Sequence, residues 1–152
     1  MRRLITIVLG VVAVVAGAAQ EQSPNPPVFL YAAVGPELST YAVSASNGSL
    51  SRTSSVTLPF AVQYVWPHPS TRFLYAAWSN GVQGDRHGVT AFRVDTATGA
   101  LVPHGQPIEI RHRPVHLTVD PGATHVLVAY NNPSGLSVHT LKADGTVLYP
   151  LS

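Results

Sequence analysis

Four residues in the second half of the sequence have the side chains that hydrolysis requires. Arg111, His112 and Arg113 form one cluster, and His116 follows closely. A histidine can activate a water molecule as a general base, and guanidinium groups can stabilise the oxyanion that develops on an attacked carbonyl group. We therefore predict that His116, Arg113 and Arg111 are catalytic and that His112 contacts the substrate. The chain has no Gly-x-Ser-x-Gly nucleophile turn, so this chemistry would use water directly.

Structural roles explain the same residues equally well. A loop that contains Arg111, His112 and Arg113 is well solvated without any catalytic purpose, and His116 falls on the polar side of an alternating strand, where it could simply pack. The sequence alone leaves both interpretations open.

Other polar residues fall in loops that we expect near this cluster. We predict that Asp85, Arg86, Asn131 and Asn132 contact the substrate, because they follow apolar strand cores. The glycine-containing stretch from Gly81 to Gly88 lacks the lysine and the following helix of a phosphate-binding loop.

The histidine content does not indicate a metal site. The chain has seven His but no Cys, which excludes thiolate ligands. His112 and His116 lie roughly 13 Å apart if that segment is extended, too far to share one ion. No His and carboxylate spacing matches a known site. We therefore predict no metal and no cofactor.

An internal repeat predicts the elements that position these residues. The core Phe29–Ala33 returns as Phe73–Ala77 and more loosely as Val126–Tyr130, at intervals of about 44 to 52 residues. Each core is followed by a strand and a turn that ends in glycine, at Gly48, Gly99 and Gly145. Repeats of this length with strand chemistry are typical of β-propeller blades.

The predicted fold class is therefore all-β, a partial propeller of about three four-stranded antiparallel blades preceded by a signal peptide. Thirteen Pro, twelve Gly and one Met also suit short strands separated by turns. The strands are expected at Val28–Val34, Ser39–Ser44, Leu50–Leu58, Ala61–Trp66, Phe73–Trp78, Val89–Asp95, Ala100–Pro103, Ile108–Ile110, Val115–Val119, His125–Tyr130, Leu136–Leu141 and Val147–Tyr149.

The first residues predict export to the periplasm or the exterior. Residues 1–19 contain two arginines, an apolar run too short for a membrane span, and small residues at a cleavage site, so we interpret them as a signal peptide. Residues 20–27 form a Pro- and Gln-rich linker, and residues 28–152 the partial propeller. Removing Arg2 and Arg3 leaves seven Lys and Arg against seven Asp and Glu. This balance argues against nucleic-acid binding, and cleavage would leave no membrane anchor.

Three blades are too few to close a ring. Propellers hold about four to eight blades, because each sheet must bury both faces against neighbours. We therefore expect a portion of a longer protein, a truncated product, or a piece that completes its ring by association. Self-association through the terminal blades is one such route.

The chain resembles the lactonase family of seven-bladed β-propellers, which includes 6-phosphogluconolactonase and carboxymuconate cyclase-like proteins. The likeness rests on the strand Phe73–Ala76 with the segment Gly88–Leu101, the run Arg113–Gly122, and Asn131-Asn132 before Leu136–Leu141 with Asp144-Gly145. It implies a lactone or sugar-acid substrate and hydrolysis of the lactone ring by complete relatives.

The resemblance also implies limits on activity. The family's catalytic His, Arg and Glu come largely from blades after the third, so we expect this chain alone to be inactive. The alternative is a non-catalytic exported propeller segment that binds a ligand or a protein.

Overall fold

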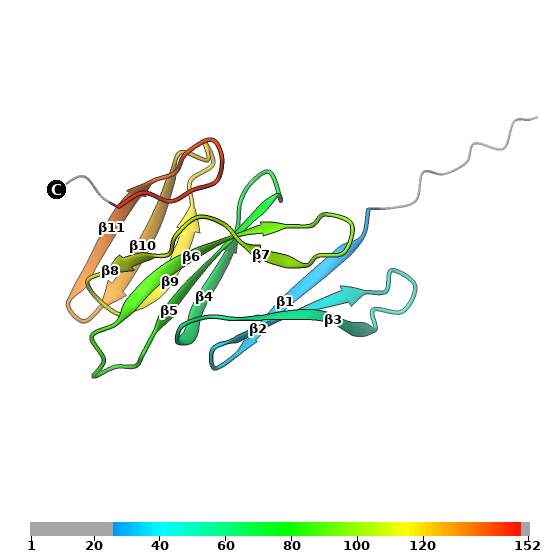
Figure 1. Cartoon of the computed structure of the whole chain (residues 1–152), viewed down its shortest axis with the longest axis horizontal. Helices are drawn as coiled ribbons and strands as arrows, with labels where there is room; N and C mark the ends of the chain where they lie inside the picture. Colours follow the sequence, from blue (N-terminus) through cyan, green and yellow to red (C-terminus); the bar gives the residue numbers. More distant parts are fainter. Residues whose placement is uncertain (1–25, 150–152) are drawn as a thin grey trace, which may run out of the picture.

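Three antiparallel sheets, one for each repeat, build the protein in the computed structural model, which describes residues 26–149. The sheets stand side by side in the order of the chain (Figure 1). We call them blade 1 (β1-β2-β3), blade 2 (β4-β5-β6-β7, with β8 also paired to β6) and blade 3 (β9-β10-β11). The strands are β1 Val28–Val34, β2 Glu37–Val43, β3 Leu50–Thr57, β4 Ala61–Pro67, β5 Phe73–Ser79, β6 His87–Val94, β7 Leu101–Pro103, β8 Ile108–Ile110, β9 Pro114–Val119, β10 His125–Asn131 and β11 Ser134–Thr140.

This arrangement confirms the prediction of an all-β partial propeller. The predicted signal peptide, residues 1–19, lies outside the described residues, as does most of the predicted linker; of the linker, Pro26 and Pro27 are described and exposed. Within residues 26–149 we find no helix that could cross a membrane.

The sheets differ from the predicted strands at their edges. The expected final strand Val147–Tyr149 is reduced to a single bridge between Leu141 and Val147. Blades 1 and 3 therefore have three described strands each, and only blade 2 has more. The loop expected from Ser79 to Gly88 is shorter than predicted, because Ser79 and His87 pair across β5 and β6.

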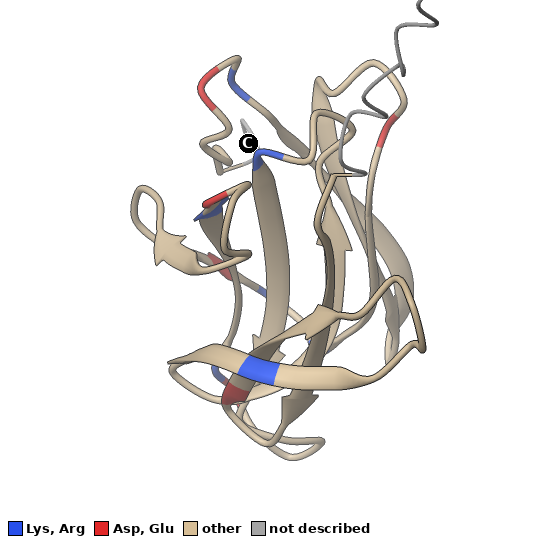
Figure 2. Ribbon diagram, turned by 90° about the vertical axis from the view of Figure 1, so that its right-hand side faces the viewer, with Lys and Arg blue, Asp and Glu red and all other residues tan. Residues whose placement is uncertain are grey.

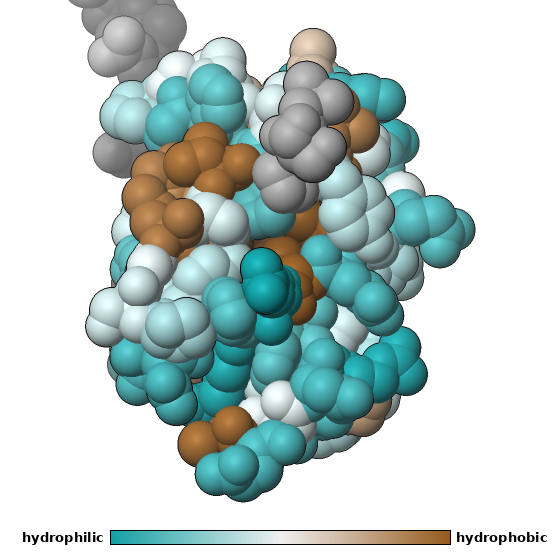
Figure 3. Space-filling model, turned by 90° about the vertical axis from the view of Figure 1, so that its left-hand side faces the viewer, coloured by the Kyte–Doolittle hydropathy of each residue, from teal (hydrophilic) through white to brown (hydrophobic). Residues whose placement is uncertain are grey.

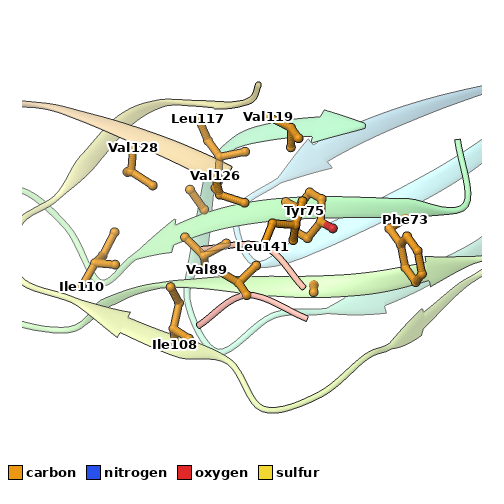
Figure 4. Close-up of a cluster of buried hydrophobic side chains, with 13 residues drawn as sticks. Phe73, Tyr75, Val89, Ile108, Ile110, Leu117, Val119, Val126, Val128 and Leu141 are labelled. Carbon is orange, nitrogen blue, oxygen red and sulfur yellow. The ribbon is translucent and has the colours of Figure 1, made fainter. Parts of the chain in front are cut away.

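Two hydrophobic cores lie between consecutive blades. The core between blades 2 and 3 joins β5, β6 and β8 to β9 and β10, and Leu141 and Val147 extend it at the end of blade 3 (Figure 4). The core between blades 1 and 2 includes Leu38, Leu74, Trp78 and Phe92. Blade 2 is buried on both faces because each face of its sheet carries apolar side chains, and β5 is buried along its whole length.

A specific contact recurs where one blade meets the next. In blade 2, the ring of Phe73 lies over the turn glycine of blade 3, so that a Cβ on Gly145 would come within 2.7 Å of that ring. The hydroxyl of Tyr75 donates a hydrogen bond to the Gly145 carbonyl at 3.0 Å. Gly145 also has a φ of +86°, which favours glycine. We call this contact the aromatic clasp.

Blade 1 makes the same clasp on blade 2. The ring of Phe29 covers Gly99, where a Cβ would come within 2.5 Å, and Tyr31 donates to the Gly99 carbonyl at 2.9 Å. Burial raises the pKa of Tyr31 and of Tyr75, so both hydroxyls stay protonated and able to donate. The clasp therefore explains why Phe and Tyr recur two residues apart in the strand core of the first two repeats.

The third repeat aligns one residue away from the sequence-based alignment. That alignment equates Phe73 with Val126, whereas the turns equate it with His125. Thr71 and Ala123 have the same positive φ, 59° and 54°, two residues before β5 and β10 begin. Their N–H groups donate to the carbonyls of His68 and Asp120 in matching turns. Blade 3 thus lacks the Phe-x-Tyr pair.

We predict that Tyr75→Phe lowers the free energy of unfolding by about 1–3 kcal/mol, because the buried Gly145 carbonyl would lose its hydrogen bond from this hydroxyl. Chemical denaturation followed by circular dichroism measures the change. Tyr41→Phe is the matched control, because Tyr41 is half-buried and its hydroxyl has no hydrogen bond to any described residue. Equal losses for the two variants would contradict the role of the clasp.

Candidate functional site

Most of the predicted site residues lie at one end of the sheets. Strand β5 ends at Ser79 and β6 begins at His87, which pairs with Ile110 at the end of β8. The loop from 111 to 113 starts immediately after Ile110, at the same end. Strand β9 begins at Pro114, which pairs with Tyr130 near the end of β10. The hairpin between β10 and β11 therefore lies beside the start of β9, next to the loop from 111 to 113. Antiparallel pairing therefore brings the loops 80–86, 111–113 and 132–133 to one face.

Arg111 and His112 line a pocket of about 450 Å³ in this region. That volume is within the range of small-molecule sites. The pocket lies between the end of blade 2 and strand β11 of blade 3. Its remaining walls are formed by Glu109, Ile110, Tyr130, Pro133, Ser134, Gly135, Leu136, Ser137, His139 and Tyr149.

A chain of polar side chains forms one wall of the pocket. The hydroxyls of Tyr130 and Ser137 are hydrogen-bonded, and Ser137 Oγ lies 2.8 Å from His139 Nε2. The ring of His112 meets Tyr130 edge-on, with 5.6 Å between centroids. Nδ1 of His139 is buried without a hydrogen-bond partner in the described part of the chain. Either hydroxyl can donate to the other, so the chain can present Tyr130 to a ligand as donor or acceptor.

The sequence analysis missed Tyr130, Ser137 and His139 as pocket residues. Ser137 pairs directly with Val128, and His139 with Val126, which places both polar side chains on the core face of β11. Two-residue alternation along the strand was a signal for their shared face. Their contact with Tyr130 depends on the pairing of β10 with β11, which the sequence does not specify.

His116 occupies a different position from Arg111 and His112. Its ring lies 4.3 Å from the ring of Tyr64 and 5.9 Å from that of Trp66, centroid to centroid. Both aromatic residues belong to β4, the inner strand of blade 2, which lies beside β9. His116 does not line the pocket described above. The two aromatic rings fix the plane of the imidazole at the junction of two inner strands.

Arg113 lies close to the buried His87. Burial lowers the pKa of His87, the charge of Asp85 opposes this shift, and the charges of His112 and Arg113 add to it. Nε of Arg113 is buried with no hydrogen-bond partner among residues 26–149. Arg113 belongs to the same loop as Arg111 and His112, but it does not line the pocket.

The pair formed by Ser79 and His87 has the geometry of a nucleophile and its base, with 2.9 Å between Oγ and Nδ1. Both residues are buried, and Ser79 is completely inaccessible. The Gly81 N–H donates to Ser79 Oγ at 3.0 Å. Because a substrate could not reach this hydroxyl, we interpret the pair as an anchor for the loop from 80 to 86.

The remaining predicted contacts are exposed. Arg86 forms an ion pair with Glu109 at 3.2 Å, and its guanidinium lies 5.5 Å from the centre of the Phe60 ring. Asp85 accepts a hydrogen bond from the Asn80 amide at 3.3 Å. An exposed ion pair of this kind adds little stability, but it holds Glu109 at the rim of the pocket.

Asn131 and Asn132 are exposed and are not among the residues that line the pocket. The Asn131 carbonyl accepts a hydrogen bond from the Ser134 hydroxyl at 3.3 Å. Elsewhere the few charged residues are scattered with both signs interspersed, as the view from the blade 1 side shows (Figure 2). In the described part of the chain, no group of three or more His, Asp or Glu side chains is placed to hold a metal ion.

Comparison with known proteins places the chain among propellers. Residues 30–150 match the family model described as "Lactonase, 7-bladed beta-propeller". Comparison with curated proteins found no significant match.

Solved structures agree with this fold. The chain is similar to a candidate 6-phosphogluconolactonase from Bacteroides fragilis, with a TM-score of 0.67 and 19% identity over 79% of this chain and 33% of the other. It is also similar to a periplasmic gluconolactonase from Pseudomonas aeruginosa, with a TM-score of 0.62 and 21% identity over 80% of this chain and 36% of the other. The chain thus spans about a third of the length of each structure.

We predict that stability falls as the pH drops below about 6.5 and that His139 contributes to this loss. Burial lowers the pKa of His139 from its usual 6.5, so the unfolded chain binds a proton that the folded chain excludes. This contribution is complete above pH 6.5 and is lost as the pH falls toward the lower folded pKa. The slope per buried histidine is at most about 1.4 kcal/mol per pH unit.

Denaturation at several pH values between 5 and 8 measures this slope. His139→Gln should reduce the slope between pH 6.5 and 5. The control His125→Gln replaces an exposed histidine, and we expect it to keep the wild-type slope. An unchanged slope in His139→Gln would contradict the prediction.

Proposed function

Because the chain belongs to the lactonase family of seven-bladed β-propellers, we propose that it forms part of a propeller that binds a lactone, or the sugar acid that the lactone opens to, at its loop end. The match to the family model over residues 30–150 is the observation that carries this proposal. The pocket adjoining Arg111 and His112 supports it, because cationic and hydrogen-bonding groups suit a carboxylate or a polarised carbonyl.

In this proposal His116, Arg113 and Arg111 are the catalytic residues of the complete protein. His116 takes a proton from the attacking water while the water oxygen bonds to the lactone carbonyl carbon. Arg113 and Arg111 stabilise the oxyanion of the tetrahedral intermediate. The bond from that carbon to the ring oxygen then breaks, and the ring oxygen receives the proton from His116. The product is an open hydroxy acid.

The chain alone is proposed to bind without turnover. The pocket lining includes Arg111 and His112 but neither His116 nor Arg113, so it supports ligand binding more directly than catalysis. We also propose Asp85, Arg86, Asn131 and Asn132 as contacts at its rim. Further groups would come from the remaining blades of the propeller.

We predict that gluconate, a stable hydroxy acid, shifts the NMR signals of the Arg111 and His112 amides in a saturable way. Arg111→Ala should weaken this binding about tenfold, because a charge-assisted hydrogen bond contributes about 1.5 kcal/mol. Arg93→Ala is the matched control, since Arg93 is exposed near the opposite end of β6. Shifts that are absent, or that survive Arg111→Ala unchanged, would contradict the proposed site.

A turnover assay separates binding from catalysis. With glucono-δ-lactone, we expect this chain to give no loss above the spontaneous rate. Excess loss that His116→Ala or Arg113→Ala abolishes would show that the chain is active by itself, contrary to the proposal.

We further propose that the protein is exported. The basic, apolar and small-residue segments of residues 1–19 support this, and one of the compared structures is a periplasmic gluconolactonase. Expression of the whole chain in a bacterium should give a periplasmic or secreted product whose mass corresponds to cleavage near Ala18 or Ala19. A product that stays inside the cell with residues 1–19 attached would contradict export.

A further inference from the structure

Three side chains of blade 3 form a continuous series of hydrogen bonds, which we call the relay. The hydroxyls of Tyr130 and Ser137 are hydrogen-bonded, and Ser137 Oγ lies 2.8 Å from Nε2 of His139. All three residues line the pocket between blades 2 and 3. Tyr130 and Ser137 are half-buried, whereas His139 is 1% exposed. The hydroxyl end of the relay is therefore open to a ligand, and the imidazole end is closed to solvent.

His139 is the member of the relay that titrates near neutral pH. Burial lowers the pKa of its imidazole from the usual 6.5. Burial raises the pKa of the Tyr130 phenol above its usual 10.0, although the hydrogen bond with Ser137 acts in the opposite direction. Between about pH 5 and 8 the two hydroxyls therefore keep their protons, and only the imidazole gains or loses one.

In the neutral ring of His139 the proton lies on Nδ1. The backbone of Leu148 raises the pKa of His139, which is the effect of a carbonyl oxygen on a ring N–H, although no described residue gives Nδ1 a hydrogen bond of normal geometry. A carbonyl beside one ring nitrogen places the proton there and leaves the other nitrogen as an acceptor. Nε2 then accepts from Ser137, and Ser137 accepts from Tyr130. The Tyr130 oxygen offers the pocket a lone pair and no proton.

Protonation of His139 reverses every hydrogen bond of the relay. Both nitrogens of a charged imidazole are donors, so Nε2 donates to Ser137. Ser137 then donates to Tyr130, and the Tyr130 hydroxyl donates into the pocket. The pocket therefore prefers a hydrogen-bond donor, such as a ligand hydroxyl, while His139 is neutral, and an acceptor, such as a carboxylate, once His139 is charged.

Few charged groups line the pocket together with the relay. Arg111 belongs to the loop after β8, and Glu109 of β8 is paired with Arg86 at 3.2 Å. The other titratable groups of the lining are His112 and Tyr149, whose hydroxyl accepts a hydrogen bond from the N–H of Glu109 at 3.0 Å. The side of the molecule that blade 3 presents has apolar patches separated by polar surface (Figure 3). In such surroundings a few placed polar groups decide which ligand binds.

We infer that Tyr130 determines the specificity of this pocket and that His139, acting through Ser137, sets whether the Tyr130 hydroxyl donates or accepts. Tyr130 contacts the ligand, and Ser137 and His139 are positioning residues. The inference rests on the proposed function, because it concerns the ligand of the same pocket. For the carboxylate of a sugar acid, the relay gives tighter binding in acid than at neutral pH.

NMR spectroscopy of the full chain without ligand tests the relay by itself. The ring nitrogen shifts of His139 should place the proton on Nδ1 at about pH 8. The ring signals of Tyr130 should titrate together with His139, and Ser137→Ala should remove this titration from Tyr130. Ser134→Ala is the matched control, because Ser134 also lines the pocket but donates to the Asn131 carbonyl at 3.3 Å and lies outside the relay. A neutral His139 protonated at Nε2, or Tyr130 signals that ignore Ser137→Ala, would overturn the inference.

Binding of gluconate at about pH 8 and about pH 5 tests the consequence for the ligand, since its carboxylate stays ionised in this range. His112→Gln is present in every chain, so that the second histidine of the lining does not contribute to the comparison. We expect binding about tenfold tighter at the lower pH, because a donor then faces the carboxylate in place of a lone pair. Ser137→Ala and Tyr130→Phe should each abolish this difference, and Ser134→Ala should keep it.

The variants separate the relay from a direct effect of charge. Ser137→Ala keeps His139 and its positive charge in acid, so a pH dependence that survives this change would show that the charge acts alone and would overturn the inference. Tyr130→Phe repeats the test if Ser137→Ala does not reproduce the wild-type circular dichroism. Gluconate that binds at neither pH contradicts the proposed function, and the signals of Tyr130 without ligand then decide for or against the relay.

Discussion

Blades 1 and 2 of this protein are each held to the following blade by an aromatic ring and a hydroxyl placed over a turn glycine. The ring of Phe73 can approach the backbone of blade 3 closely only because Gly145 has no side chain. The adjacent hydroxyl of Tyr75 satisfies a carbonyl that burial would otherwise leave unpaired. This contact fixes the position of one sheet along the strand direction of its neighbour. The apolar faces of the two sheets then meet in a defined register. The loops that carry Arg111 and His112 owe their position to that register.

The strands could be predicted from the sequence because each apolar core is bounded by turn residues, and the glycine turns mark the hairpins. The register of the third repeat could not be predicted from the sequence. The segment from Val126 to Tyr130 is apolar in either frame, so hydropathy does not choose between them. The deciding residues, Thr71 and Ala123, share a left-handed conformation that neither residue type signals. Backbone geometry was needed to show that His125 is the equivalent of Phe73.

Only part of the candidate site could be predicted from the sequence, because the rest of it also depends on how the strands pair. Arg111 and His112 lie in a loop between blades, and both their position in the sequence and the chemistry of their side chains predict a ligand site. Tyr130, Ser137 and His139 come from strands, and they form a polar chain only because β10 and β11 pair in one register. His116 shows the opposite case. Its residue type suggested chemistry, but its nearest aromatic neighbours, Tyr64 and Trp66, are contributed by another blade, which no local pattern reveals.

Native-state hydrogen exchange of the three turn glycines tests the central role of the clasp most directly. The amides of Gly48, Gly99 and Gly145 each donate to the backbone carbonyl that closes their turn, four residues back for Gly48 and Gly99 and three residues back for Gly145, so all three amides are hydrogen-bonded. Because only Gly99 and Gly145 lie beneath a ring of the preceding blade, we expect their amides to exchange at least an order of magnitude more slowly than that of Gly48. Equal exchange at all three glycines would show that the turns, and not the clasp, hold the blades together.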